Sequence, residues 1–344
     1  MKTLLEEIFE QPEVLHRCLD YYRSLESWLH HSLGRKLPAT ITFTGMGASL
    51  YASLPAVYYL NARGFPARYL ETAELLYYQI SLLSAREWLV VISQSGETVE
   101  LRRLLARLRR HRPRLAAITN NPQSTLGRQA DLVLPLQAGE QAFASTKTYT
   151  ASVVVALLLA ALWSEGTMRP LLDGLARDLK AFQKLLAEAH RQAGVLANVV
   201  SQANYVALLG RGPSLASAQE GALLFKEVCA RPAEGMTGAE FRHGPLELLA
   251  QPLAAVLFAP GGPVHRMDST LRRDLVRHGA RVLWISPSRE RTPGACTFRL
   301  PPCFPALTPL FEIVPVQFLT WELARRAGRE PGRLRIASTV TLRE

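Results

Sequence analysis

The sequence predicts an α/β protein with two tandem doubly wound parallel-sheet domains, each built as three αβα layers. One reason is an internal repeat, in which a Gly-x-Gly-x-Ser-Leu turn occurs twice at an offset of 165 residues. The other is the regular alternation of buried strands with helical segments, which is typical of a parallel sheet covered on both faces. The paired segments are 41–60 with 205–225, 89–93 with 254–259, and 115–121 with 281–288.

The remaining segments have helical periodicity or little apolar periodicity. We expect a helical segment over 1–35, a first sheet domain over 36–165, a helical linker over 166–201, a second sheet domain over 202–328, and a tail over 329–344 that lies over the active site. Acidic residues interrupt the apolar pattern of the first segment, so it does not resemble a signal peptide. The apolar stretch 152–163 is too short to cross a membrane and is interpreted as a buried helix.

Composition narrows the class of protein. A chain of 344 residues with 48% hydrophobic and 20% charged residues is typical of a soluble protein with two domains. The net charge of +11 comes mostly from arginines on helix faces, with no nucleic-acid motif or aromatic platform beside them. The four cysteines lack the spacing of a zinc site. We therefore expect a cytoplasmic protein with no metal, no cofactor, no nucleic-acid or membrane partner, and an acidic small-molecule substrate.

A polar turn separates the predicted buried strand that begins at Leu89 from the helix that follows it. Ser93, Gln94, Ser95 and Thr98 supply three hydroxyls and an amide where the new helix exposes free N–H groups. These N–H groups and the helix dipole favour an anion such as phosphate. The alternative is a simple N-cap by Ser95 or Thr98, but a cap needs only one such residue.

Two further polar turns also place small or polar residues at the start of a predicted helix. Ligands of doubly wound sheets bind at the carboxyl ends of the strands, where the strand order reverses. Gly47 and Ser49 also follow a strand, so we expect them beside the polar turn; a dinucleotide fingerprint is disfavoured because Leu50 replaces its third glycine. The segment "ASTK", with Ala144, Ser145 and Lys147, precedes an apolar helix and is either another anion-binding helix start or an N-cap by Ser145.

The second half contains candidates for proton transfer. Glu220 and Glu227 are seven residues apart, so they share one helix face with Leu224 between them. Partial burial would raise the pKa of such a carboxyl group and suit it to act as a general base. Alternatively both are solvent residues, or Glu227 forms an ion pair. His243 lies in a turn bounded by glycine and proline and is a second candidate.

Together these motifs resemble the SIS (sugar isomerase) superfamily, and more closely the isomerase half of glutamine–fructose-6-phosphate aminotransferase. The resemblance implies two flavodoxin-like domains in a homodimer that binds a small-molecule sugar phosphate. It implies that Glu227 moves a proton between C1 and C2, and that His243, contributed across the dimer interface, assists ring opening. It implies that the sugar phosphate is held by Ser49, Ser93, Gln94, Ser95 and Thr98. The motifs that carry the resemblance are "EIFEQPEVL", "SQSGET", "ASTKTYTA", "EGALLFKE", "EFRHGPLELL" and "STVTLRE".

Two departures from the family pattern shape the expected activity. Synthases of this family carry one lysine where Leu224 stands and another near the C-terminus, where this sequence offers Ser338 or Thr339. We expect no glutaminase half, since the sequence begins Met1-Lys2. An aminotransferase needs an amine to activate its ketose. We therefore expect an isomerase or deaminase of a hexosamine 6-phosphate. The alternatives are a synthase-type isomerase subunit without its own glutaminase and a non-catalytic sugar-phosphate-binding regulator.

Overall fold

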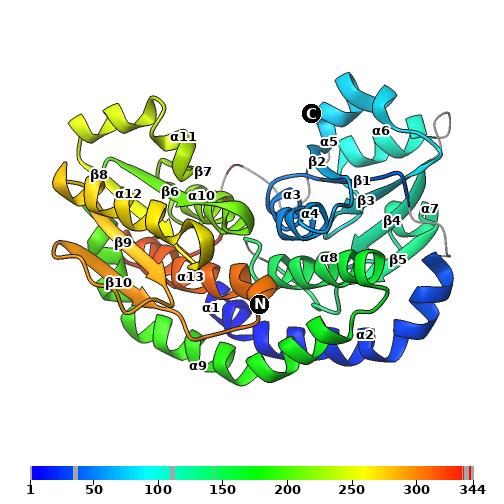
Figure 1. Ribbon diagram of the computed structural model, residues 1–344, viewed down its shortest axis with the longest axis horizontal. Helices are drawn as coiled ribbons and strands as arrows, with labels where there is room; N and C mark the ends of the chain where they lie inside the picture. Colours follow the sequence, from blue (N-terminus) through cyan, green and yellow to red (C-terminus); the bar gives the residue numbers. More distant parts are fainter. Residues whose placement is uncertain are drawn as a thin grey trace. The chain divides into compact units, whose positions relative to one another are not determined.

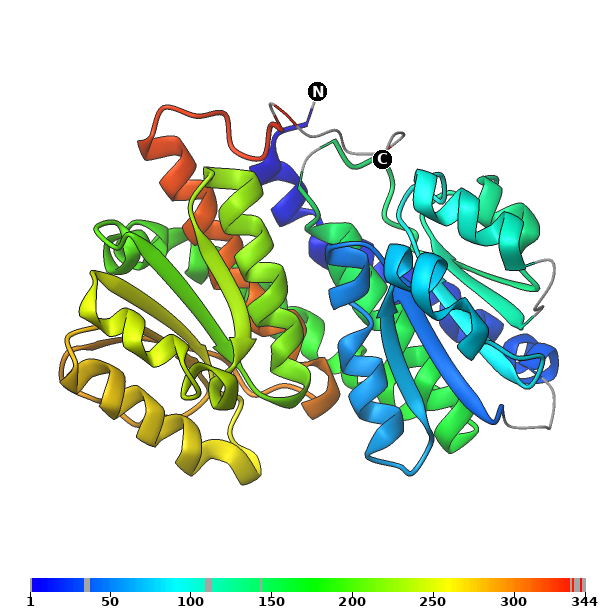
Figure 2. The same ribbon diagram turned by 90° about the horizontal axis from the view of Figure 1, so that it is seen from above.

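The computed structural model describes residues 2–33, 38–108, 113–142, 144–334, 336 and 341. The chain forms two compact units, each with one five-stranded sheet (Figures 1 and 2). Unit 1 comprises Met1–Phe9, Ala142–Ala144 and Asp178–Leu334, and unit 2 comprises Glu10–Gln141, Ser145–Arg177 and Arg335–Glu344.

The sheet of unit 2 is parallel throughout, and its strand order is β2-β1-β3-β4-β5. Its strands are β1 (Thr40–Gly45), β2 (Ala67–Glu71), β3 (Glu87–Ile92), β4 (Arg114–Thr119) and β5 (Leu132–Pro135). The helices of unit 2 are α2 (Gln11–Leu33), α3 (Ala48–Tyr51), α4 (Leu54–Asn61), α5 (Thr72–Glu74), α6 (Val99–Leu108), α7 (Thr125–Gln129) and α8 (Lys147–Glu165). The order reverses between β1 and β3, which makes the carboxyl ends of these two strands the expected ligand-binding edge.

The sheet of unit 1 has the order β10-β9-β8-β6-β7, again fully parallel, which is the same topology as in unit 2. Its strands are β6 (Tyr205–Gly210), β7 (Ala233–Thr237), β8 (Leu253–Phe258), β9 (Arg281–Ser286) and β10 (Ala295–Arg299). Its helices are α1 (Leu4–Phe9), α10 (Leu215–Cys229), α11 (Gly238–Phe241), α12 (His265–Arg277) and α13 (Thr308–Arg326). The predicted pair of doubly wound parallel sheets is confirmed.

Each sheet is buried on both faces, as parallel sheets are. All six residues of β3 and all six of β8 are buried. One face of the unit 2 sheet packs on α6 and α7 through a cluster that includes Leu89, Leu104 and Leu126. The matching cluster in unit 1 joins its sheet to α12. Alternate side chains of each strand point to the opposite face and give the three-layer arrangement.

The most apolar stretch of the sequence forms helix α8. Among the described residues it is long and apolar enough to span a membrane, but 89% of its apolar window is buried inside the protein. Every residue from Ser152 to Trp163 is buried. The interpretation of this stretch as a buried helix is therefore confirmed. The linker region also forms a single helix, α9 (Arg169–Val200).

The crossover before the last strand differs between the two sheets. In unit 2 the connection from β4 to β5 contains the helix α7, whose Leu126 is fully buried in the core. In unit 1 the equivalent connection, residues 287–294 between β9 and β10, has no helix. This loop therefore covers its sheet edge with fewer apolar side chains than α7 does.

Candidate functional site

The polar turns that follow β1 and β3 lie against each other in unit 2. A Cβ built on Gly45, the last residue of β1, would be 3.0 Å from the carbonyl oxygen of Ile92 at the end of β3 and 2.9 Å from the backbone nitrogen of Leu50. Only glycine allows this approach. As a result Gly47, which precedes α3 with φ of 51°, and Ser49 are placed at the same sheet edge as the Ser93–Thr98 turn.

Hydroxyl groups brace the turn after β3. The Ser93 Oγ accepts a hydrogen bond of 3.1 Å from the N–H of Gly96, and the Ser95 Oγ accepts one of 3.3 Å from the N–H of Glu97. Gly96 has φ of 67°, and a Cβ there would lie 2.1 Å from the Ser124 Oγ, so the turn requires glycine. Ser93 is buried, whereas the other predicted phosphate ligands, namely Ser49, Gln94, Ser95 and Thr98, are half-buried.

The one carboxylate of this turn is bound elsewhere. Glu97 accepts hydrogen bonds of 2.6 Å from the Thr125 N–H and 2.8 Å from the Thr125 hydroxyl, at the start of α7. Two donors on one carboxylate compensate its charge locally. The turn can therefore present hydroxyl and amide donors to an anion without a competing free carboxylate.

The start of α6 is also contacted by the far end of the chain. The N–H of Val99, the first residue of α6, donates a 3.0 Å hydrogen bond to the carbonyl oxygen of Thr341. Neither Ser95 nor Thr98 uses its side chain to accept a hydrogen bond from a described N–H of α6, so the N-cap alternative is not the role that these hydroxyls have in this structure. The predicted tail residue Ser338, and Thr339 beside it, lie outside the described residues.

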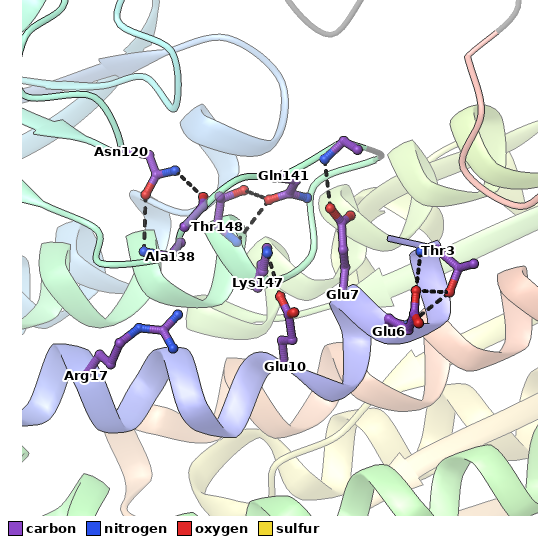
Figure 3. Close-up of polar contacts among 12 residues, drawn as sticks. Thr3, Glu6, Glu7, Glu10, Arg17, Asn120, Ala138, Gln141, Lys147 and Thr148 are labelled. Carbon is purple, nitrogen blue, oxygen red and sulfur yellow. Dashed lines mark hydrogen bonds and ion pairs between the residues drawn. The ribbon is translucent and has the colours of Figure 1, made fainter. Parts of the chain in front are cut away.

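The third predicted anion-binding turn has a mainly structural arrangement. Lys147 begins α8, is 1% exposed, and places its Nζ 2.6 Å from the Glu10 carboxylate, as Figure 3 shows. Thr146, not Ser145, occupies the N-cap position, and the Ser145 hydroxyl lies 2.9 Å from that of Thr148. Ala144 is buried and belongs to unit 1. The charge of Lys147 is therefore balanced within the protein.

The predicted proton-transfer carboxylates share helix α10 in unit 1, which packs against β6, β7 and α13. Glu220 is 1% exposed, and neither of its carboxylate oxygens has a hydrogen-bond partner. Glu227 is half-buried, and Leu224 between them is buried. The sequence spacing predicted the shared helix but not this difference in burial.

Burial changes the proton affinity of both groups. It raises the pKa of Glu227 to about 7, although the positive charge of neighbouring Lys226 opposes the shift. Burial also raises the pKa of Glu220 well above its usual value, and the negative charge of Glu227 adds to the effect. A carboxyl group with a pKa near 7 exchanges protons readily at neutral pH, as a general base must. Glu220, which is more deeply buried, therefore has a higher proton affinity than an ordinary carboxyl group.

His243 lies two residues beyond α11, which begins with a capping box formed by Thr237 and Glu240. The His243 N–H donates a 2.9 Å hydrogen bond to the Glu240 carbonyl, and the imidazole is exposed. Gly244, with φ of 124°, follows and ends the turn. An exposed imidazole on a rigid turn is free to contact a ligand or another chain.

The buried carboxyl group of Glu312 was not predicted from the sequence. Glu312 on α13 is fully buried, and it accepts hydrogen bonds of 2.8 Å from the Ser214 hydroxyl and 2.9 Å from the Ser217 hydroxyl. Burial raises its pKa to about 7, against the effect of the two hydroxyls. Ser214 is the repeat counterpart of Ser49, so in unit 1 the equivalent turn binds an internal carboxyl group. The only sequence signal was one acid in the apolar run "PLFEIVPV".

The chain is a tandem doubly wound α/β protein, and its polar turn follows a strand at the point where the strand order reverses, which is where such sheets bind their ligands. A family model identifies the protein family within this fold class. The SIS domain model matches residues 38–162 and 200–292, and the chain belongs to this family.

Curated relatives extend the similarity over almost the whole chain. A glutamine–fructose-6-phosphate aminotransferase [isomerizing] of Zymomonas mobilis is 29% identical over 98% of this chain and 58% of its own length. The enzyme of the same name from Pyrococcus horikoshii is 32% identical over 98% of this chain and 57% of its own. The chain thus spans less than two thirds of the length of these relatives.

Solved structures share the fold. The C-terminal domain of glucosamine-fructose-6-phosphate aminotransferase from Francisella tularensis has a TM-score of 0.83 at 22% identity, with 96% of this chain and 97% of that chain covered. Tagatose-6-phosphate ketose/aldose isomerase from Escherichia coli has a TM-score of 0.82 at 21% identity, with 98% and 97% covered. Glucosamine-6-phosphate deaminase from Thermotoga maritima has a TM-score of 0.77 at 19% identity, with 99% and 100% covered.

Proposed function

We propose that the protein is a phosphosugar isomerase that also deaminates a hexosamine 6-phosphate. Glu227 removes the proton from C2 of the open-chain aldose and returns it to C1. One proton of the C2 amino group passes to the C1 oxygen, so the aldehyde becomes a hydroxyl group and the amino group becomes an imine. Water adds to this imine, the carbon–nitrogen bond breaks, and ammonia and a ketose 6-phosphate are released. No oxidant, metal or external amine is needed, since the substrate supplies its own nitrogen.

The observation that carries the proposal is the partial burial of Glu227 and the raised pKa that results from it. Its pKa of about 7 places it where a base for C–H proton transfer is most effective at neutral pH. A solvent-exposed carboxylate on a helix surface would keep the ordinary pKa of a glutamate side chain. The exposed imidazole of His243 is proposed to act on the sugar ring of the partner subunit in a homodimer.

The substrate phosphate is assigned to the polar turn of unit 2. Ser49, Gln94, Ser95 and Thr98 are half-buried at a sheet edge, and the only carboxylate of the turn is satisfied by Thr125. Names of the relatives support the substrate class, because they act on fructose 6-phosphate or glucosamine 6-phosphate. The hydrogen bond from Val99 to Thr341 supports a tail over this turn.

Two alternative functions are each supported by a separate observation. An isomerase subunit that aminates fructose 6-phosphate is favoured by the curated relatives, but the buried Leu224 supplies no amine beside Glu220 and Glu227. A sugar-phosphate-binding regulator would keep the polar turn and need no base. The raised pKa of Glu227 favours the enzyme over the regulator.

The test combines ammonia release with exchange of the C2 proton in D₂O, using glucosamine 6-phosphate. We expect both in the wild type, and a loss of about 10²–10⁴-fold in Glu227→Gln, which keeps the shape but cannot accept the proton. Glu188→Gln, on the linker helix α9, is the control and should retain both activities. Exchange without ammonia would leave an isomerase only. If the wild type binds hexose phosphates but exchanges no proton, the protein is a sugar-phosphate-binding regulator and not an enzyme.

A further inference from the structure

The helix-free crossover of unit 1 leaves a hollow at the edge of its sheet. The hollow has a volume of about 720 Å³ and lies between the 287–294 loop and one face of β10. Residues 295, 297 and 299 of β10 all line it, as alternate residues on one face of a strand do. In unit 2 the equivalent crossover contains α7. The polar residues around the hollow are Ser288, Arg289, Arg291, Thr292, Thr297 and Arg299.

Three arginines give this hollow an uncompensated positive charge. Arg289, Arg291 and Arg299 are exposed, and none of them forms an ion pair with a residue that the structure describes. None of the described residues that line the hollow carries a carboxylate. Three cations brought together repel one another, and a bound polyanion would remove that repulsion.

The nearest acid of the loop is already neutralised. The Glu290 carboxylate lies 2.6 Å from Arg272, accepts a 2.8 Å hydrogen bond from the Ser269 hydroxyl, and lies 3.2 Å from the His265 Nε2. Arg272 is fully buried and stacks on Trp284 at 4.2 Å, so this ion pair is held in place. The Glu290 carboxylate is therefore paired with residues of α12 and is not among the residues that line the hollow.

The loop that carries two of the arginines is held close to α12. Gly294 has φ of 85°, and a Cβ there would lie only 2.9 Å from a methyl carbon of Val276 on α12. A larger residue would be strained in this backbone conformation and would push the loop away from the helix. The wall of the hollow thus depends on the folded loop and is more than a chance gathering of surface side chains.

The chemistry of the lining selects a class of ligand. Guanidinium groups bind phosphate oxygens in pairs of parallel hydrogen bonds, and hydroxyl groups complete the oxygen ligands. A volume of this size accepts a small molecule. No aromatic side chain lines the hollow, so it offers no platform for stacking a nucleobase. We propose that this hollow binds a small molecule that carries two or more phosphate groups, through Arg289, Arg291 and Arg299.

No described residue of the predicted substrate site lines the hollow, and the hollow lies at β10, whereas α10, which carries Glu227, packs on β6 and β7 at the other side of the same sheet. Binding at the hollow also does not depend on the proposed reaction. Inorganic pyrophosphate is the simplest probe of the proposal, and orthophosphate is its single-phosphate comparison. Calorimetric titration at constant ionic strength separates a built site from general attraction to a basic protein.

We expect saturable binding of pyrophosphate to the wild type, at least tenfold tighter than binding of orthophosphate. Loss of one charge-assisted contact should weaken binding about tenfold in Arg291→Gln or Arg299→Gln. Arg291→Lys keeps the positive charge but loses the paired guanidinium hydrogen bonds, so its affinity for pyrophosphate should lie between those of the wild type and Arg291→Gln. Arg277→Gln, an exposed arginine outside the hollow, is the matched control and should bind as the wild type does. A melting curve for each variant verifies that it is folded.

Three outcomes would overturn the proposal. They are the absence of saturable pyrophosphate binding, equal affinities for pyrophosphate and orthophosphate, and unchanged binding in both arginine variants. A fourth outcome would assign the surface to a different ligand: single-stranded RNA binds and is lost in the same variants, while pyrophosphate does not bind.

Discussion

The backbone N–H of Val99 donates a 3.0 Å hydrogen bond to the carbonyl oxygen of Thr341. This joins the first residue of α6 to a residue near the end of the chain. Helix N-termini attract anions because their first N–H groups lack intrahelical partners. The tail thus supplies an acceptor at the helix start where the sequence predicts a sugar phosphate, and it is positioned to respond to what binds there.

Removal of residues 335–344 should separate binding from turnover. We expect the truncated protein to keep the melting shift caused by a hexose 6-phosphate, because the polar turn remains. Ammonia release should fall about tenfold or more, since a segment that covers a reacting sugar excludes water and positions it. The measurements are thermal melts and steady-state kinetics of the two proteins. Equal turnover numbers would remove the tail from the proposed mechanism.

The polar turn itself is tested by ligand-induced stabilisation. A hexose 6-phosphate at a hundredfold excess over its Kd should stabilise the wild type by about 2.7 kcal/mol. The unphosphorylated hexose should not, and Ser95→Ala should lose most of the shift. Ser201→Ala, an exposed serine in the other unit, is a matched serine control. Equal shifts from both sugars would contradict a phosphate site at this turn.

The extent to which sequence predicted structure depends on the kind of signal. The repeat of Gly45-x-Gly47 and the alternation of strands and helices specified the fold, because both reflect local geometry and burial. The sequence also predicted that Glu220 and Glu227 share a helix. It did not reveal the hydrogen bonds from Ser214 and Ser217 to Glu312, which join residues about a hundred positions apart. Nor did it reveal the Thr341 contact, since a backbone carbonyl leaves no signature in residue type.

Burial of Glu220 predicts a pH-dependent cost to stability. Burial raises the pKa of Glu220 in the folded protein above the ordinary carboxyl value of 4.5, so above that pH the folded protein binds this proton more tightly than the unfolded chain does. The folded state then binds more protons, so this group lowers the free energy of unfolding as pH rises. Glu220→Gln has no such titration, and its melting temperature relative to the wild type should increase from pH 5 to pH 8. The exposed Glu13→Gln should show no comparable trend.

A homodimer is expected because His243 is exposed on a rigid turn and is proposed to serve the partner's site. Light scattering at micromolar concentration should give twice the chain mass. Co-expression of His243→Ala with Glu227→Gln should restore part of the activity, since one site of each mixed dimer then holds an intact Glu227 and an intact His243. A monomer with full activity, or no recovery in mixed dimers, would exclude the shared site.

The pKa of Glu227 predicts the pH dependence of catalysis. A general base must be ionised to accept a proton, so kcat/KM should increase tenfold per pH unit below about pH 7 and level off above it. The positive charge of Lys226 lowers this pKa against the effect of burial. Lys226→Gln should therefore move the acid limb of the profile to higher pH, whereas Lys184→Gln on α9 should leave it in place. Glu227→Gln should remove the limb altogether and reduce kcat/KM by about 10²–10⁴-fold. If the acid limb stays unchanged in Lys226→Gln and persists in Glu227→Gln, another group is the base.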